Sequence, residues 1–339
     1  MKRFIVLLLS LLSISLFISC GKSGIYEESF KMEEIIGTVI TVEAYGISSN
    51  KAVEKAFDRA KELEEILSVE IESSEISKVN STAYKEEVHL SDELFYVLKK
   101  SLYYAELTEG AFDPTIGILI DLWSIGTEKA KIPDNNDIDI YKNNKGYKKV
   151  ILNEKNKTVK FEDKDIQLNF GAIAKGYIAD EMKKVLIDEF NIKSAILNLG
   201  GNVVTIGNKE SGEPWKIGIC NPINTYEISG SVEVEGKTIV TSGNYEKYFE
   251  EDGVRYHHIL DPSTGYPSKN GCISSTIITE NSIDADALST AVYVLGTEDG
   301  KRLIESIDGV EAIFINEDMS IEKTSGCNSS EINFKALGE

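Results

Sequence analysis

Positive charge is scarce in this chain, whose 339 residues include 36 Lys and Arg against 56 Asp and Glu and carry a net charge of −20. Such an acidic surface repels the phosphate backbones of DNA and RNA, which excludes nucleic-acid binding as the main function. A small phosphorylated ligand can still bind through local basic groups, backbone N–H donors or a bridging metal ion. The composition therefore allows phosphate chemistry only at a confined site.

Cysteine is also rare, with Cys20 followed only by Cys220, Cys272 and Cys327. The last three match no zinc-ligand spacing and are too few for a disulfide scaffold, although an exported protein can form one bridge. We interpret them mainly as buried or incidental thiols. Internal repeats and long low-complexity linkers are lacking too. With 42% apolar residues, the chain can build one large domain or two closely joined lobes.

The longest apolar run, residues 4–17, is too short and too close to the terminus to favour a permanent membrane span. It follows two basic residues, which is the layout of an export signal over residues 1–19. A small residue directly before Cys20 resembles the lipobox of bacterial lipoproteins, in which the cysteine is lipidated; the alternative is an ordinary signal with an incidental cysteine. We expect residues 20–32 to form a polar tether and the protein to be exported and lipid-anchored at the outer face of a bacterial membrane. Signal removal would change the net charge from −20 to −22, because two positive charges leave with it.

Hydrophobic periodicity indicates both helices and strands, without strict βαβ alternation, and so predicts an α+β fold. Helices are expected over 51–67, 92–109, 174–190, 284–295 and 297–307, and strands over 38–45, within 150–170, and over 195–199, 215–220, 231–241, 273–279, 311–316 and 319–323.

Two of the three histidines, His257 and His258, lie among glycine-marked turns in residues 241–267. In a strand they point to opposite faces, so only one of them would face a site. Asp286 and Thr290 are four residues apart and share a face if their segment is helical. An imidazole with hard oxygen ligands suits phosphate chemistry with a divalent cation. The alternatives are a hydrogen-bonded structural histidine and an acidic first turn of a helix.

Two further segments, residues 110–117 and 169–177, are typical of ligand-binding turns. Lys175 would lie in the first turn of a helix, where the macrodipole disfavours a cation, and this hints at an anionic ligand. The P-loop spacing is absent. Asp113 could be a polar contact, or its segment could simply be a helix C-cap followed by a proline turn. The glycine turns after residues 199 and 241 could likewise be ordinary turns.

Together these segments resemble the ApbE family, the FAD:protein FMN transferases, many of which are lipoproteins. The resemblance covers residues 37–303, and each motif alone is weak, while their order and number make it specific. It rests on SEIS at 74–77 with Asn80, GAFDPTIG with Trp123, GAIAKGY with Asp180, NLGGN, TSGNYEKY, HHILDPSTGYP and ADALSTA.

The resemblance implies a single ApbE-like domain over 33–330, built of two closely joined lobes with an FAD cleft between them, and a C-terminal tail at 331–339. It implies Mg²⁺-dependent transfer of FMN from FAD to a Thr or Ser hydroxyl of an acceptor protein, with release of AMP. The metal ligands would be the backbone carbonyl of Ala172 and the side chains of Asp286 and Thr290.

Other roles also follow from the resemblance. His258 and Asp286 are the candidates for handling the acceptor proton, with His258 slightly favoured. The FAD contacts would be Ala111, Phe112, Asp113, Lys175, Thr241, Ser242 and Gly243. Four positions depart from the usual family pattern and could alter flavin affinity or ring stacking; they are Ile36, Glu70, Ser124 and Asn202.

The family suggests FMN-binding subunits of exported or membrane redox complexes of the Rnf and Nqr type as acceptors. The chain lacks a convincing acceptor motif of the S/T-G-A-T kind, so we interpret it as the modifying enzyme. Two alternatives stay open. One is Mg²⁺-dependent FAD hydrolysis to FMN and AMP, and the other is a lipoprotein that only binds FAD.

Overall fold

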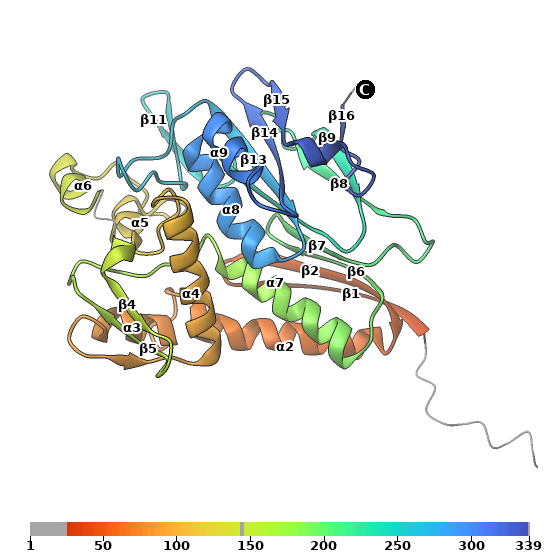
Figure 1. Ribbon diagram of the computed structural model, residues 1–339, viewed down its shortest axis with the longest axis horizontal. Helices are drawn as coiled ribbons and strands as arrows, with labels where there is room; N and C mark the ends of the chain where they lie inside the picture. Colours follow the sequence, from red (N-terminus) through yellow and green to blue (C-terminus); the bar gives the residue numbers. More distant parts are fainter. Residues whose placement is uncertain (1–25, 143–145, 338–339) are drawn as a thin grey trace, which may run out of the picture.

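The main sheet of the computed structural model contains eight strands in the order β1-β2-β6-β7-β10-β13-β14-β15, and each neighbouring pair is antiparallel (Figure 1). The structure describes residues 26–142 and 146–337. In β2 the alternation predicted from the sequence directs Ile40, Val42 and Ala44 into the core. The strands are Tyr26–Ile35 (β1), Thr38–Ile47 (β2), Ser194–Leu199 (β6), Asn202–Ile206 (β7), Thr238–Gly243 (β10), Cys272–Thr279 (β13), Glu311–Asn316 (β14) and Ile321–Lys323 (β15).

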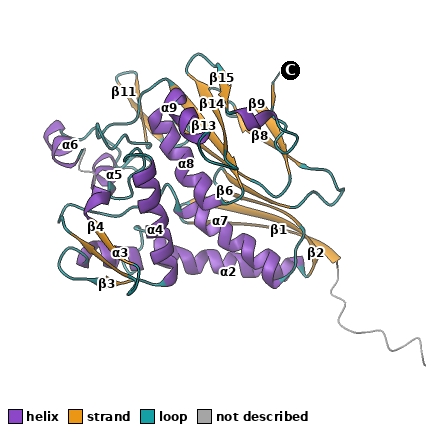
Figure 2. Ribbon diagram, viewed as in Figure 1, coloured by secondary structure: helices purple, strands orange, loops and turns teal. Residues whose placement is uncertain are grey.

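Helices α2, α7 and α8 cover one face of this sheet, and α9 packs beside α8 and β14 (Figures 1 and 2). Helix α2 is amphipathic, and its buried Ala56, Phe57, Ala60 and Leu63 recur at helical spacing on the side that faces the sheet. Helix α7 continues into one π-helical turn, Val185–Glu189. The helices are Ser49–Leu67 (α2), Ala174–Lys184 (α7), Ser282–Leu295 (α8) and Thr297–Ile304 (α9).

A small sheet of order β16-β9-β8 covers part of the opposite face. Its Trp215, Val232 and Phe334 pack against Ile278 and Ile313 of the main sheet in a second apolar core. The molecule is therefore layered as helices, large sheet and small sheet. The small sheet is made of Trp215–Cys220 (β8), Ile228–Val234 (β9) and Lys335–Ala336 (β16).

A second lobe lies on the left of Figure 1 and carries a three-stranded sheet of order β3-β5-β4. The principal core is continuous across both lobes, since Leu94 and Phe161 of this lobe belong to the same buried cluster as Phe57 and Leu288. This continuity confirms an α+β domain in two closely joined lobes. The lobe consists of Glu75–Thr82 (α3), Val88–His89 (β3), Asp92–Leu107 (α4), Gly117–Trp123 (α5), Asn135–Tyr141 (α6), the 3-10 turn Gly146–Lys149, Val150–Asn153 (β4) and Thr158–Phe161 (β5).

Several sequence predictions of local structure were wrong. Part of the predicted tether, from Tyr26 on, belongs to strand β1. The strand was missed because the charged Lys31 occupies a core-facing position, where it covers the ring of Phe57. The predicted tail at 331–339 includes β16, and its Phe334 is buried. The single strand predicted over 231–241 is two strands, β9 and β10, separated by a turn. Strand β7 and helices α3, α5 and α6 were not predicted.

The predicted export signal and Cys20 lie outside the described residues. Within the described ranges, no helix is both long and apolar enough to cross a membrane. Cys220, Cys272 and Cys327 are free thiols, and the last two are buried, as the sequence interpretation expected. Burial raises the pKa of Cys272 and of Cys327 to about 11, so both stay protonated near neutral pH.

Candidate active site

The candidate site is built around the junction of α7 and α8, where each helix caps the other. Asp180 of α7 accepts hydrogen bonds from the backbone N–H groups of Ser282 and Ile283 at the start of α8, at 2.8 and 2.9 Å. In return, Oδ2 of Asp286 in α8 accepts the N–H of Gly176 in the first turn of α7, at 2.9 Å. Each carboxylate satisfies N–H groups that a helix start leaves free, and complements the positive end of the dipole.

Gly176 is required where these helices touch. A Cβ atom at this position would lie 2.2 Å from the carbonyl oxygen of Ser282 and 2.6 Å from its carbonyl carbon. Both are backbone atoms, which cannot rotate away. Only glycine therefore lets α7 approach α8 closely enough for the carboxylate of Asp286 to reach the Gly176 N–H.

Lys175 lies beside this cap. Its Nζ is 3.4 Å from Oδ1 of Asp286 and 3.3 Å from the carbonyl oxygen of Gly171. The Asp286 side chain is 4% exposed and that of Lys175 is 24% exposed, so the ammonium group lies between a buried carboxylate and solvent. The carboxylate offsets the unfavourable position of a cation in the first turn of α7. Lys175 thus has a structural partner and still presents its charge at an accessible place.

Hydroxyl groups extend the site from α8 to the end of β10. Ser242 Oγ is 2.8 Å from Ser289 Oγ and 3.4 Å from Thr290 Oγ1. Asp286, Ser289 and Thr290 are separated by three and four residues on α8, so they share the face that looks toward β10. Next to them, Thr241 Oγ1 is 2.8 Å from Thr276 Oγ1 of the neighbouring strand β13. The structure therefore brings the TSG segment close to the ADALST helix. The turn expected at residues 241–243 is wrong, because these residues form the end of strand β10 and pair with β13.

His258 follows the hairpin of Tyr248–Glu251 (β11) and Val254–His257 (β12) and is fixed by one carbonyl group. The oxygen of Lys247 is 3.0 Å from the His258 backbone nitrogen and 3.2 Å from its Nδ1. A carbonyl can only accept, so Nδ1 carries the proton and Nε2 keeps a free lone pair. The surrounding protein keeps water from part of this ring and so disfavours its charged form, and the charge of Lys175 acts in the same direction. Together they lower the pKa of His258 to about 4.

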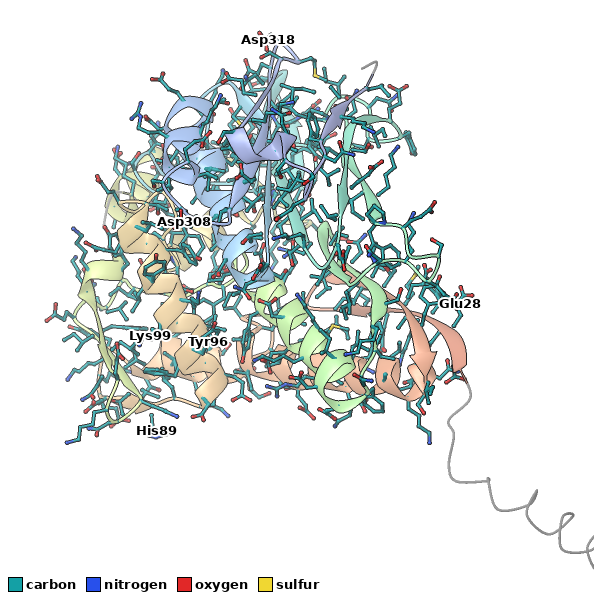
Figure 3. The ribbon with its side chains drawn as sticks, turned by 45° about the vertical axis from the view of Figure 1, so that its right-hand side comes forward. Glu28, His89, Tyr96, Lys99, Asp308 and Asp318 are labelled. Atoms are coloured by element: carbon teal, nitrogen blue, oxygen red, sulfur yellow. The ribbon has the colours of Figure 1, made fainter. Side chains whose placement is uncertain are left out.

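His257 has the opposite orientation. It is 5% exposed, its Nε2 donates to the carbonyl of Ser268 at 3.0 Å, and its ring edge meets Tyr293. Burial lowers the pKa of His257 to about 4. The two rings therefore have different partners, and His257 has a packing role. Strand alternation is not the reason, because His258 is a bend residue directly after β12. The third histidine, His89, is exposed on β3 at the lower end of the second lobe (Figure 3).

The second lobe holds the His258 loop through an aromatic cluster. Trp123 at the end of α5 is 1% exposed, and its Nε1 donates to the carbonyl of Gly265 at 2.8 Å. Its ring stacks on Tyr256 and meets Tyr266 edge-on, with centroids 5.6 and 5.5 Å apart. These contacts attach residues on both sides of His258 to α5.

The predicted flavin contacts at 111–113 lie between α4 and α5 in the second lobe. The carbonyl of Pro114 accepts the N–H of Asn169 at 2.8 Å, which joins this segment to the start of the GAIAKGY turn. Asp113 lines a depression together with Pro262, so the GAFDP and HHILDP segments converge. Phe112 is buried in the principal core, and Asp113 accepts the N–H of Thr115 at 2.9 Å. Burial raises the pKa of Asp113. Both side chains therefore have structural partners as well.

Glu246 was not singled out from the sequence, although it lies in the TSGNYEKY motif. Its side chain is exposed, yet the surrounding protein and the charge of Asp286 raise the pKa of Glu246, while Lys175 and Lys247 act against that increase. The charges of Lys175 and Asp286 therefore act on this carboxylate. Ser289 and the Gly176 N–H were also missed, because a hydroxyl and a backbone group give no distinctive sequence signal.

The departures from the family pattern have different surroundings. Ile36 and Ser124 adopt left-handed backbone conformations, with φ of 51° and 48°, and a glycine would fit the Ser124 position without strain. Glu70 is exposed, and Asn202 is 1% exposed at the start of β7. None of the four carries a group that contacts Asp286 or Thr290 among the described residues.

The donor atoms at the junction match the preferences of a hard divalent cation. Asp286 Oδ1 and Thr290 Oγ1 make only long polar contacts, of 3.4 Å each, within the part of the chain that the structure describes. Ala172 precedes α7 by two residues and belongs to the same turn as the Gly171 carbonyl that Lys175 contacts. Carboxylate, hydroxyl and carbonyl oxygens suit Mg²⁺, which needs few protein ligands. Among the described residues no three His, Cys, Asp or Glu side chains form a metal cluster, and this donor set does not require one.

Comparison with known proteins identifies what this arrangement is similar to. The ApbE family matches residues 36–314. The FAD:protein FMN transferase of Treponema pallidum is 34% identical over 326 residues, covering 91% of this chain and 90% of that protein. The crystal structure of the ApbE protein from Thermotoga maritima has a TM-score of 0.83 and 32% identity, covering 90% of this chain and 99% of that one. The apo form of the flavinyl transferase ApbE from Pseudomonas stutzeri follows at 0.79 and 25%, covering 90% and 97%.

Proposed function

This chain belongs to the ApbE family and is a flavin transferase, and we propose that it transfers FMN from FAD to a Ser or Thr hydroxyl of an acceptor protein, with AMP as the leaving group. The proposal is supported by the contacts of Lys175 with Asp286 and of Thr290 with Ser242, where α8 meets α7 and β10, and by a neutral His258 whose pKa the charge of Lys175 helps to lower. A cation, hard oxygen donors and a neutral imidazole are the groups that phosphoryl transfer requires.

The reaction exchanges one bond to phosphorus for another. The oxygen of the acceptor hydroxyl forms a P–O bond to the phosphorus on the FMN side of the FAD diphosphate. The bond from that phosphorus to the bridging oxygen breaks, and AMP leaves with the bridging oxygen. The proton of the hydroxyl must pass to a base, and FMN remains on the acceptor as a phosphoester.

His258 is the group that accepts this proton in our proposal. Its Nδ1–H is engaged by the Lys247 carbonyl, which leaves Nε2 unprotonated. A pKa of about 4 keeps the ring neutral at physiological pH, and an anionic diphosphate beside it would raise that pKa toward the working range. Asp286 is less suited, because its carboxylate already accepts the Gly176 N–H and lies beside Lys175.

The start of α7 and Lys175 bind the diphosphate in this account. Ile173, at the N-cap of α7, provides no side-chain cap. The N–H of Ala174 donates to the Phe170 carbonyl and that of Gly176 to Asp286, so among the described residues the Lys175 N–H is the first-turn donor that remains available to an anion. The flexible side chain of Lys175 can turn from Asp286 toward a phosphate oxygen. Ala111, Phe112, Asp113, Thr241, Ser242 and Gly243 would line the remaining FAD contacts.

Mg²⁺ would be held by the carbonyl of Ala172 and the side chains of Asp286 and Thr290. When bound, the ion neutralises charge on the diphosphate and on the leaving group. These ligands carry one negative charge, that of Asp286. The bound ion would therefore supply most of the positive charge at the site of an otherwise acidic protein. The structure supports the assignment through the two oxygens that lack short hydrogen bonds.

We also propose that the protein is exported and lipid-anchored at Cys20, which precedes β1 by only a few residues. FMN-binding subunits of membrane redox complexes of the Rnf and Nqr type would then be accessible acceptors, because both partners are held at the same membrane face. Expression with Cys20→Ala tests the anchor, since the variant should lose labelling with a radioactive fatty acid and leave the membrane fraction. Retention of both properties would contradict the anchor.

In-gel flavin fluorescence tests the proposed reaction. The protein without its first 25 residues is incubated with FAD, Mg²⁺ and a recombinant FMN-binding domain, and the acceptor band should become fluorescent. Removal of Mg²⁺ with EDTA, or replacement of the acceptor hydroxyl by alanine, should abolish the signal. An acceptor that stays dark while AMP accumulates would instead identify the protein as an FAD pyrophosphatase.

A further inference from the structure

Four large apolar side chains are exposed together at one end of the small sheet. Ile223 is 71% exposed, Tyr226 99% and Ile228 43%, all in or next to the loop between β8 and β9. Leu337, 69% exposed, is adjacent, because its N–H donates to the carbonyl of Ser229 at 2.8 Å. We call Ile223, Tyr226, Ile228 and Leu337 the apolar tip. Single exposed apolar residues are common, but a group of them marks an interaction surface.

The loop that carries this tip is ordered by its own hydrogen bonds. Oδ1 of Asn221 accepts the N–H groups of Ile223 and Asn224, at 2.9 and 3.1 Å. The Asn221 N–H donates to the carbonyl of Glu227 at 3.0 Å and closes the base of the loop. The apolar side chains are therefore held outward on a fixed backbone, which lowers the conformational entropy lost when a partner binds.

The loop also begins next to the candidate active site. Cys220, the last residue of β8, contacts the hydroxyl of Tyr245. Burial is the main cause of the raised pKa of the Cys220 thiol, and the nearby carboxylate of Glu246 adds to it. The Tyr245 ring covers Gly243 at the end of β10. A short series of contacts thus joins the start of the loop that carries the tip to the residues assigned to FAD.

From this position we propose that the apolar tip is the docking surface for the acceptor protein. The inference rests on the proposed function, in which the second substrate is a folded protein that must bring a hydroxyl to the site. FAD is too small to need an apolar platform on a separate sheet. A membrane is a poorer occupant than a protein, because Glu227 is exposed within the same loop and repels anionic lipid headgroups.

A double variant, Ile223→Ser with Tyr226→Ser, tests the surface. Because both side chains are exposed, the variant should fold with unchanged stability. We expect the KM for a recombinant FMN-binding domain to rise about tenfold or more, as for loss of interface anchor residues, with kcat and the KM for FAD unchanged. A matched control is Phe30→Ser with Met32→Ser on β1, whose side chains are 62% and 59% exposed on a different sheet edge. The control should leave all constants unchanged.

A short peptide that contains only the acceptor hydroxyl sequence provides a second arm, because it cannot reach the tip. The double variant should modify this peptide as fast as the wild type does. An unchanged KM for the FMN-binding domain, or an equal loss with peptide and domain, would overturn the docking proposal. Loss of binding to vesicles of phosphatidylglycerol, with the KM for the domain unchanged, would identify the tip as a membrane contact. If the wild type releases no AMP with either acceptor, the proposed function fails instead.

Discussion

Replacement of Gly176 by alanine tests whether the close contact of α7 and α8 builds the site. The new Cβ would lie 2.2 Å from the Ser282 oxygen and 2.6 Å from its carbon, so the two helices must separate. Overpacking of this kind costs about 1–3 kcal/mol. The higher helix propensity of alanine returns at most about 1 kcal/mol. With the full return, the net destabilisation is about 0–2 kcal/mol, and the Tm should fall by up to about 6 °C.

The same separation should also lengthen the 2.9 Å bond from the Gly176 N–H to Asp286 and displace Lys175. The affinity for FAD should therefore fall several-fold, which fluorescence quenching on titration with FAD would measure. Gly300→Ala is a matched control, since its Cβ would lie 2.9 Å from Val292 Cβ in the contact of α9 with α8. This control should lose stability and keep its FAD affinity. A Gly176→Ala variant as stable as the wild type, with unchanged affinity, would show that the close contact of α7 and α8 does not build the site.

Three further predictions concern charge. Asp286→Asn keeps the shape of the side chain and an acceptor for the Gly176 N–H, so the free energy of unfolding in urea should change by less than about 1 kcal/mol. Mg²⁺-dependent AMP release should fall at least about a hundredfold. Activity near the wild-type level would remove the metal assignment. Lys175→Met should raise the Kd for FAD about tenfold, because one charge-assisted contact to the diphosphate is lost, and the loss should shrink at high salt. Burial lowers the pKa of His257 to about 4 from an ordinary 6.5. As the pH falls from 6.5 to 4, the unfolded chain therefore takes up the proton first, and the free energy of unfolding decreases by up to about 1.4 kcal/mol per pH unit. This slope should be smaller in His257→Gln, and an equal slope in both proteins would contradict the buried neutral ring.

The sequence predicts correctly those helices and strands whose apolar residues all lie on one packed face. Helices α2, α4 and α8 lie within two residues of their predicted bounds, because their buried residues recur every three to four positions. Strand β1 escaped prediction, since its core-facing Lys31 and Glu33 take part in ion pairs over α2 and look like solvent-exposed charges. The turn that separates β9 from β10 was also missed, although Gly236 marks it.

For the site, spacing along the chain correctly placed Asp286 and Thr290 on one face. His257 and His258 have different partners, although strand alternation is not the reason. Spacing could not reveal the reciprocal caps, because Asp180 and Asp286 act on N–H groups of the other helix, about a hundred residues away in sequence. Backbone donors and carbonyl acceptors carry no residue-type signal. The roles of Gly176 and of the Lys247 carbonyl therefore needed coordinates.

The ratio of AMP formed to FMN bound to the acceptor distinguishes transfer of FMN from its release. The protein, FAD and Mg²⁺ are mixed with an excess of an FMN-binding domain, AMP is quantified by chromatography, and the acceptor is weighed by intact-mass spectrometry. Transfer requires one AMP for each acceptor that gains the mass of an FMN phosphoester. AMP formed without any gain in acceptor mass would contradict it.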